Sequence, residues 1–203
     1  MSDVPAHERA RGAGWRVPFV LGLACLAASG ALAVRAVLLG QSWAELRAEA
    51  LAAFERPAVS LDAALLDPGS ALPSVEVSGY PFVAVLEIPE IGLVLPVLEE
   101  GAGESLGVAP CVAVGTPYAA DLVIEGGGSD EGLGRLGELS GDERVVVRDA
   151  LGNSFAYEAN GVRDLRPTSL GRALEEGGAG ALTLCEVNDA GEVVRLVSCD
   201  SVG

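Results

Sequence analysis

From Pro81 onward the sequence consists of short runs of β-branched and apolar residues that are separated by turn residues. Runs of this length at this spacing are typical of an all-β barrel or sandwich. We predict about eight strands, near Val83–Ile88, Leu93–Leu98, Val112–Val114, Leu122–Glu125, Arg144–Arg148, Ser154–Glu158, Ala181–Val187 and Val193–Cys199. The pattern therefore predicts a single all-β domain over residues 81–203.

Two stretches between the strands have the composition of short helices. The first runs from Asp130 to Leu139, and the second runs from Thr168 to Glu176. Thr168 can cap the second helix at its N-terminus, and Gly177-Gly178 can end it. We therefore expect two short helices beside the strands.

A segment without any charge, from Val17 to Val34, precedes the β-type region. About 20 apolar residues cross a membrane, so a transmembrane helix over residues 17–39 is our first interpretation. A secretory signal peptide cleaved near residues 31–33 is the alternative. Both place the following chain outside the cytoplasm, and the arginines before the segment favour a cytoplasmic tail over residues 1–16. We expect an uncleaved anchor in the cell membrane with an extracytoplasmic C-terminal domain.

Residues 40–80 connect the apolar segment to the β-type region. Ser42 and Glu45 have the spacing of a capping box, which predicts a helix from Trp43 to about Glu55. Residues 57–80 contain several prolines and glycines without a sustained period, so they read as a linker. A helical turn over Leu61–Leu66 is the alternative for part of that linker.

The sequence contains 13 Lys+Arg and 29 Asp+Glu, which gives a net charge of −16. An acidic chain repels phosphate backbones, so nucleic-acid binding is excluded as its main role. All the basic residues are arginines, and the absence of lysine excludes Schiff-base chemistry and a Walker-type phosphate site. The only histidine, His7, lies before the apolar segment. We expect neither a cofactor nor a metal ion.

Three cysteines follow the apolar segment, namely Cys111, Cys185 and Cys199, so at most one disulfide can form among them. A four-residue loop in the last hairpin would place Cys199 opposite Gly180. Cys185 and Cys199 are then not cross-strand neighbours. The spacing of a Cys-x-x-Cys zinc site is absent.

Several segments between Phe82 and Ser198 occur in an order shared with one protein family. They are Leu86–Gly92 with Leu95–Leu98, Leu122–Gly126, Leu136–Asp142 with Val145–Val147, Leu182–Leu184, and Val194–Val197. Together they resemble the sortases, which are membrane-anchored cysteine transpeptidases of Gram-positive cell surfaces. The resemblance implies a closed sortase-like β-barrel and a role at the cell wall or pilus.

The catalytic positions of that family carry other residues in this sequence. The pattern Val-Ile-x-Gly-His places the family's histidine at Gly127, and Thr-Leu-x-Thr-Cys places its nucleophile at Val187. Only the family's arginine is retained, at Arg195. Sortase chemistry, as the resemblance implies it, needs a thiolate to attack, an imidazolium to protonate the leaving amine and a guanidinium to steady the oxyanion. Arg195 alone cannot perform the first two steps.

Cys185 is a candidate substitute nucleophile. Because strand side chains alternate, Thr183, Cys185 and Val187 share a face, and Cys185 is directed to the same groove about 6–7 Å further back. A thiol without a nearby cation keeps a high pKa and reacts poorly. We interpret Cys185 as a small buried residue.

Arg195 has two interpretations. It shares a strand face with Val193 and Val197, and it either lines an inherited groove or pairs with an acid such as Glu125 or Glu186. In the groove it would bind a carboxylate or a backbone carbonyl.

Four acidic residues surround the vacated histidine position: Asp121, Glu125, Asp130 and Glu131. We considered a calcium site there and interpret the group instead as a solvated acidic loop.

The leading hypothesis is a membrane-anchored, sortase-like protein that has lost catalysis. We expect it to act as a peptide-binding or scaffolding module for a sorting-signal-like peptide, an active sortase or a pilus component. The first alternative is an active transpeptidase that uses Cys185 with a base supplied by a partner. The second is an unrelated exported β-domain whose likeness is coincidental.

Overall fold

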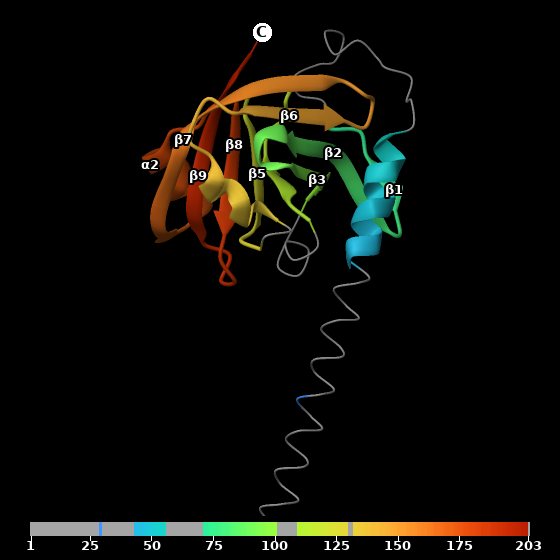
Figure 1. The fold of residues 1–203 in the computed structure, drawn as a ribbon, viewed down its shortest axis with the longest axis horizontal. Coiled ribbons are helices and arrows are strands. Elements are labelled where there is room, and N and C mark those ends of the chain that lie inside the picture. Colours follow the sequence, from blue (N-terminus) through green and yellow to red (C-terminus); the bar gives the residue numbers. More distant parts are fainter. Residues whose placement is uncertain (1–28, 30–42, 56–70, 101–108, 130–131, 203) are drawn as a thin grey trace, which may run out of the picture. The chain divides into compact units, whose positions relative to one another are not determined.

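The computed structural model describes residues 29, 43–55, 71–100, 109–129 and 132–202. These residues contain nine strands in one sheet. The strands are β1 (Val75–Val77), β2 (Tyr80–Ile88), β3 (Leu93–Leu98), β4 (Cys111–Val114), β5 (Leu122–Gly127), β6 (Arg144–Asp149), β7 (Ser154–Thr168), β8 (Leu182–Val187) and β9 (Val193–Ser201). All eight predicted strands are present (Figure 1).

The sheet closes on itself. Its order is β1-β2-β3-β4-β5-β8-β9-β7-β6, and β6 also pairs with β2. That pairing is antiparallel and runs from Ala84 opposite Asp149 to Glu87 opposite Val146. A ring of eight strands, β2 to β9, results, which confirms the predicted closed barrel and leaves few open strand edges.

The first strand, β1, lies in the segment that we interpreted as a linker. It pairs with the start of β2 through a tight turn at Ser78 and Gly79, whose φ angles are 51° and 85°. Two central residues with positive φ match the right-handed twist of a hairpin. The strand is only three residues long, so its sequence has no readable period.

Strand β7 is longer than predicted and continues to Thr168. Its pairing with β9 shifts between Ala159 and Val162 and again between Asp164 and Thr168. Irregularities of this kind place extra residues in the strand and interrupt its alternation. Gly161, whose φ is 104°, adds to this irregularity. The alternating pattern therefore ends before the strand does.

Short helices occupy the two predicted positions, and a third lies between β2 and β3. The first of the predicted pair is a 3-10 helix, η4 (Leu133–Glu138), and the second is an α-helix, α2 (Leu170–Gly177). Thr168 does not cap α2, because it is the last residue of β7 and Ser169 holds the N-cap position. The 3-10 helix η2 (Pro89–Ile91) links β2 to β3.

The barrel encloses the main hydrophobic core. Side chains from the strands fill it, and Leu133 and Leu136 of η4 are fully buried in it. We call the sheet surface that lines this core the inner face. Figure 1 shows η4, in yellow, close to β8 and β9.

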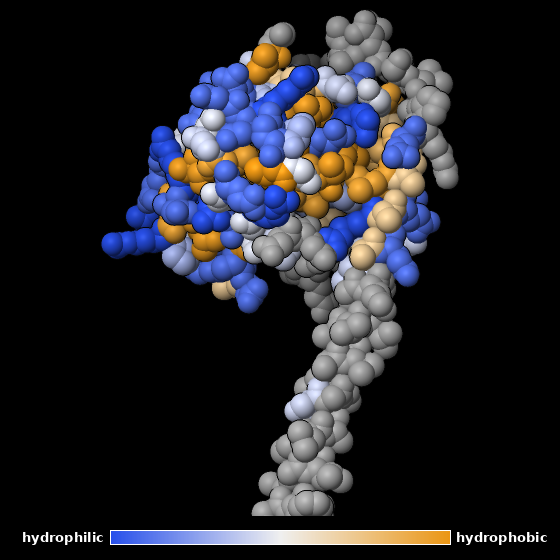
Figure 2. Space-filling view, viewed as in Figure 1, coloured by the Kyte–Doolittle hydropathy of each residue, from blue (hydrophilic) through white to orange (hydrophobic). Residues whose placement is uncertain are grey.

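A second, smaller apolar cluster lies on the opposite surface of the sheet, which we call the outer face. Its buried members are Val123, Ala173, Cys185, Val187, Val193 and Leu196. Ala173 belongs to α2, so this helix packs against the outer face. Elsewhere hydrophilic residues dominate the surface seen in Figure 2, with apolar residues in a band between them.

The predicted helix before the barrel is present over residues 43–54. Its residues from 45 onward form one compact unit with the barrel. Leu46 and Ala50 are buried, and the hydroxyl of Ser78 donates a hydrogen bond to the carboxylate of Glu49 at 3.1 Å. The helix is therefore part of the folded domain.

The anchor expected at residues 17–39 lies outside the described residues, apart from Ser29. The tail over residues 1–16 and the alternative turn over Leu61–Leu66 lie outside them as well. Within the described ranges, no helix has both the length and the apolar character needed to cross a membrane.

The last hairpin corrects one prediction. Cys199 lies opposite Leu182 and not opposite Gly180. The backbone N–H of Asn188 donates to the carbonyl of Glu192, and Val187 pairs with Val193 instead of Glu192. The pairing also shifts by one residue between Glu186 and Val187. Together these changes displace the register by two residues from the predicted one. Cys185 pairs with Leu196, which confirms that it is not a neighbour of Cys199.

Candidate functional site

The two positions to which the resemblance assigns the histidine and the cysteine, Gly127 and Val187, lie side by side. β5 and β8 are adjacent parallel strands, and their register runs from Leu122 opposite Leu182 to Gly127 opposite Val187. The last pair stands at the carboxyl ends of both strands. The fold therefore brings together the histidine and cysteine positions that the resemblance assigned.

The side chains at these positions carry no titratable group. Gly127 has no side chain, and Val187 is buried in the outer-face cluster beside Cys185. Neither Gly127 nor Val187 can therefore act as a nucleophile or a base.

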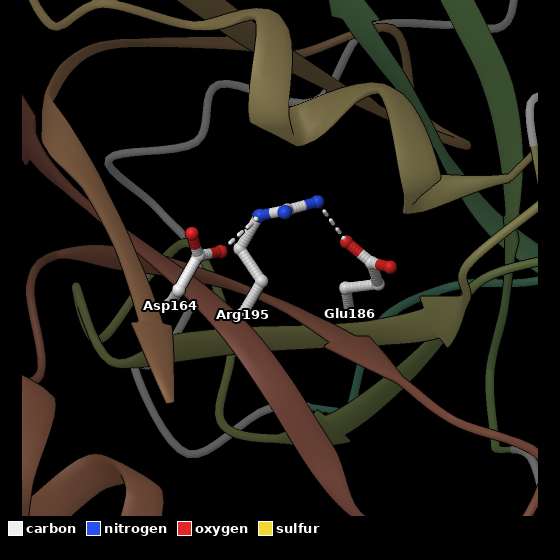
Figure 3. Close-up of polar contacts among 3 residues, drawn as sticks. All are labelled: Asp164, Glu186 and Arg195. Atoms are coloured by element: carbon white, nitrogen blue, oxygen red, sulfur yellow. Dashed lines mark hydrogen bonds and ion pairs between the residues drawn. The ribbon is translucent and has the colours of Figure 1, made fainter. Parts of the chain in front are cut away.

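Arg195 forms an ion-pair network with two carboxylates. Its Nε donates to Oδ1 of Asp164 at 2.8 Å, and its Nη1 donates to Oε2 of Glu186 at 2.6 Å (Figure 3). The side chains of Arg195 and Glu186 are 24% and 13% exposed, whereas that of Asp164 is 76% exposed. Burial alone would lower the pKa of Arg195, but the two carboxylates raise it. The guanidinium thus stays charged and is held from both sides.

Arg195 lies on the inner side of the sheet, away from Val187. Residues directly opposite each other on antiparallel strands share a face. Glu186 is opposite Arg195, and the pair before it, Leu184 opposite Val197, lies in the inner core. Val187 belongs to the outer-face cluster. The arginine and the nucleophile position are therefore near each other in register but point to opposite sides.

The structure bears on the second interpretation of Arg195, the pairing with an acid. Arg195 pairs with Glu186, as one interpretation stated, and with Asp164, which the sequence analysis missed. Asp164 is the register partner of Arg195 on β7, a contact that only the strand pairing reveals. Val197 shares the face of Arg195 as predicted, but Val193 lies on the outer face because the register shifts near Val187.

Two glycines make room for the buried end of this network. A Cβ atom at Gly137, in η4, would lie 3.0 Å from Cζ of Arg195. A Cβ atom at Gly128 would lie 2.6 Å from Oε1 of Glu186, closer than real side chains approach. The loop after β5 and the helix η4 therefore cover the arginine and Glu186 tightly.

Cys185 shares the outer face with Val187, as predicted, and is fully buried there. Burial, and secondarily the negative charge of Glu125, raise the pKa of its thiol to about 12. At neutral pH the reactive thiolate is then on the order of 10⁻⁵ of the total. This environment suits the structural interpretation of Cys185.

Glu125 lies between two thiols on the outer face. It is opposite Cys111 on β4 and opposite Cys185 on β8. The Cys111 Sγ is 3.9 Å from Oε1 of Glu125. Burial raises the pKa of Glu125, and the contact with Cys111 opposes this. The same surroundings raise the pKa of the Cys111 thiol to about 12, with burial as the largest cause.

Of the four acidic residues around Gly127, the two that the structure describes, Asp121 and Glu125, have separate partners. Asp121 accepts a hydrogen bond from the backbone N–H of Thr116 at 3.0 Å, and Glu125 lies among the thiols. Asp130 and Glu131 are outside the described residues, as is His7. Among the residues that the structure describes, no group of histidine, cysteine or acidic side chains suits a metal ion.

No protein-family model and no curated protein matches the sequence. Solved structures do match the fold. Sortase A from Corynebacterium diphtheriae aligns with a TM-score of 0.50 and 16% identity, over 61% of this chain and 62% of that chain. Its lid mutant aligns with a TM-score of 0.50 and 15% identity, over 61% and 72%.

This chain therefore has a sortase-like fold, and it spans less than two thirds of the first of these structures. The sequence likeness is too low to carry more than the fold. Whether the chain shares any sortase activity depends on its own residues.

Proposed function

We propose that this protein is a sortase-like module that binds a peptide or a partner protein at the cell surface without catalysing transpeptidation. The single observation that carries this proposal is the pairing of Gly127 with Val187 at the ends of β5 and β8. The resemblance assigns an imidazole and a thiol to these two positions, and the chain carries a glycine and a valine there. A barrel kept without its reactive groups is better suited to binding than to catalysis.

The arginine supports the same proposal. Oxyanion stabilisation needs a donor that is aimed at the reacting carbonyl. Arg195 instead donates to Asp164 and Glu186, and it points to the inner side of the sheet. Its geometry is that of a structural ion-pair network, exposed at Asp164 and mostly buried at Glu186, that ties β7, β8 and β9 together.

The apolar N-terminal segment supports a proposal about the location of the protein. We propose that residues 17–39 anchor the chain in the membrane of a Gram-positive cell and that the barrel is extracytoplasmic. A sorting-signal-like peptide, an active sortase or a pilus component is then within reach as a partner.

The rival function is an active transpeptidase that uses Cys185. Full burial and a thiol pKa of about 12 oppose it. A partner that supplied a base would also have to expose Cys185, which α2 and its neighbours cover.

The test uses the full chain in detergent micelles with an LPxTG-like sorting-signal peptide. We expect reversible binding in a fluorescence anisotropy assay and no covalent adduct by mass spectrometry. A peptide-dependent adduct that disappears in Cys185→Ala would establish the rival function. A chain that binds neither this peptide nor any partner from its own cell envelope would refute the proposed one.

A further inference from the structure

One carboxylate stands among apolar side chains and thiols on the outer face. Glu125 projects from β5 on the same side as Val123 and Gly127, two positions before and after it along the strand. Its cross-strand neighbours are Cys111 and Cys185, which are both fully buried. Glu125 itself is only partly buried, so a ligand can reach it.

Glu125 has no cationic partner within the described ranges. The ion pairs there join arginines to other carboxylates, and none includes Glu125. Arg195 is engaged on the other side of the sheet by Asp164 and Glu186. Among the described residues, the polar side-chain contact of Glu125 is the weak one from the Cys111 thiol at 3.9 Å.

This arrangement has an energetic cost. A carboxylate that is partly removed from water and lacks a paired cation makes the folded state less stable than a threonine or valine would at the same position. Burial accordingly raises the pKa of Glu125. A cation delivered by a ligand would remove this cost, and the pairing would favour its binding.

We infer that Glu125 is a specificity-determining residue of the outer face, where it pairs with a lysine or arginine side chain of a cationic peptide segment. The inference rests on the proposed function, since it names the chemistry of the peptide that the module binds. The net charge of −16 supports it, because an acidic protein attracts cationic segments from a distance. The pair at Glu125 would then fix the register of the bound segment.

The experiment compares three capped LPxTG-like peptides in which x is alanine, lysine or glutamate. Each is titrated against the full chain, against Glu125→Gln and against Glu76→Gln. The last variant is the control, because Glu76 is an exposed residue of β1 and its substitution removes the same charge. Circular dichroism checks that each variant is folded.

We expect the lysine peptide to bind the unmodified chain about tenfold more tightly than the alanine peptide. Glu125→Gln should abolish this preference, and Glu76→Gln should keep it. A second readout is the Glu125 carboxyl signal in a carbon-13 NMR titration. The pKa of Glu125 that this titration measures should fall when the lysine peptide is bound, because a nearby positive charge favours the carboxylate.

Two outcomes separate the inference from the function on which it rests. If the alanine and lysine peptides bind equally and Glu125→Gln changes nothing, the inference is wrong and the proposed function stands. If no peptide binds the unmodified chain, the inference fails, and the proposed function fails with it only if the chain also captures no partner protein from its own cell envelope.

Discussion

Gly127 and Val187 lie opposite each other at the ends of two adjacent parallel strands, β5 and β8. Side chains at such a pair are close enough to interact across the strands. These are the two positions to which the resemblance assigns the histidine and the cysteine of a sortase, and the chain carries a glycine and a valine there.

The first prediction restores the dyad with the double variant Gly127→His and Val187→Cys. The imidazole should stabilise the thiolate, so alkylation by iodoacetamide at pH 7 should be about tenfold faster than in Val187→Cys alone. The rate is measured by mass spectrometry of the intact protein, and the unmodified chain controls for the native thiols. Equal rates in the double and single variants would show that the two positions do not interact.

The second prediction concerns alkaline pH. The thiols of Cys111, Cys185 and Cys199 have pKa values raised by burial from 9.0 to about 12. In the unfolded chain they lose their protons above pH 9, while in the folded chain they keep them. The unfolded state is therefore favoured progressively as the pH rises from 9 to about 12.

Urea unfolding at pH 8, 9 and 10 measures this effect. Cys185→Val removes one titrating group at nearly constant volume, so its free energy of unfolding should fall less steeply above pH 9. The difference should be about 1 kcal/mol per pH unit. Parallel pH profiles for the two proteins would contradict the assigned burial of Cys185.

The third prediction separates the two partners of Arg195. Glu186 is 13% exposed and Asp164 is 76% exposed. Removing the buried charge leaves the guanidinium poorly compensated, so Glu186→Gln should cost about 2 kcal/mol in the free energy of unfolding. Asp164→Asn should cost less than about 1 kcal/mol, because water screens an exposed pair. Denaturant titrations of both variants test the order, and a larger loss in Asp164→Asn would be inconsistent with the network as described.

The fourth prediction concerns Asp149, which is buried at the end of β6. Its carboxylate accepts hydrogen bonds from the Tyr118 hydroxyl at 2.6 Å, from the backbone N–H groups of Leu151 and Asn153, and from the Asn153 side chain. Asp149→Ala leaves these donors without an acceptor and should cost about 3 kcal/mol. Tyr118→Phe removes a single bond and should cost about 1 kcal/mol. Thermal unfolding compares the stability of the two variants. Similar losses of stability in Asp149→Ala and Tyr118→Phe would argue against the shared network.

The fifth prediction concerns the helix before the barrel. Leu46 is buried, whereas Glu45 is exposed on the same helix. Leu46→Ala should cost about 2 kcal/mol because it leaves a cavity, and Glu45→Ala should change little. Equal unfolding midpoints for the two variants would mean that the helix does not contribute to the stability of the domain.

Local sequence pattern was sufficient to predict the barrel strands and the helix over residues 43–54. A short apolar run that is bounded by turn and polar residues can be recognised from neighbours along the chain, so β3 (Leu93–Leu98) was predicted with its full bounds. β1 and the second half of β7 were missed, because a three-residue strand has no period and irregular pairing disturbs the alternation.

The sequence alone also showed that no histidine follows the apolar segment. It likewise showed which residues stand at the two positions that the resemblance marks as catalytic. Composition and motif spacing do not depend on folding. Which carboxylates hold Arg195, which side of the sheet it faces, and how Glu125 comes to lie between Cys111 and Cys185 were decided by the tertiary structure alone. These contacts join strands far apart in sequence, and a shift of one residue in register reverses the side on which a group points.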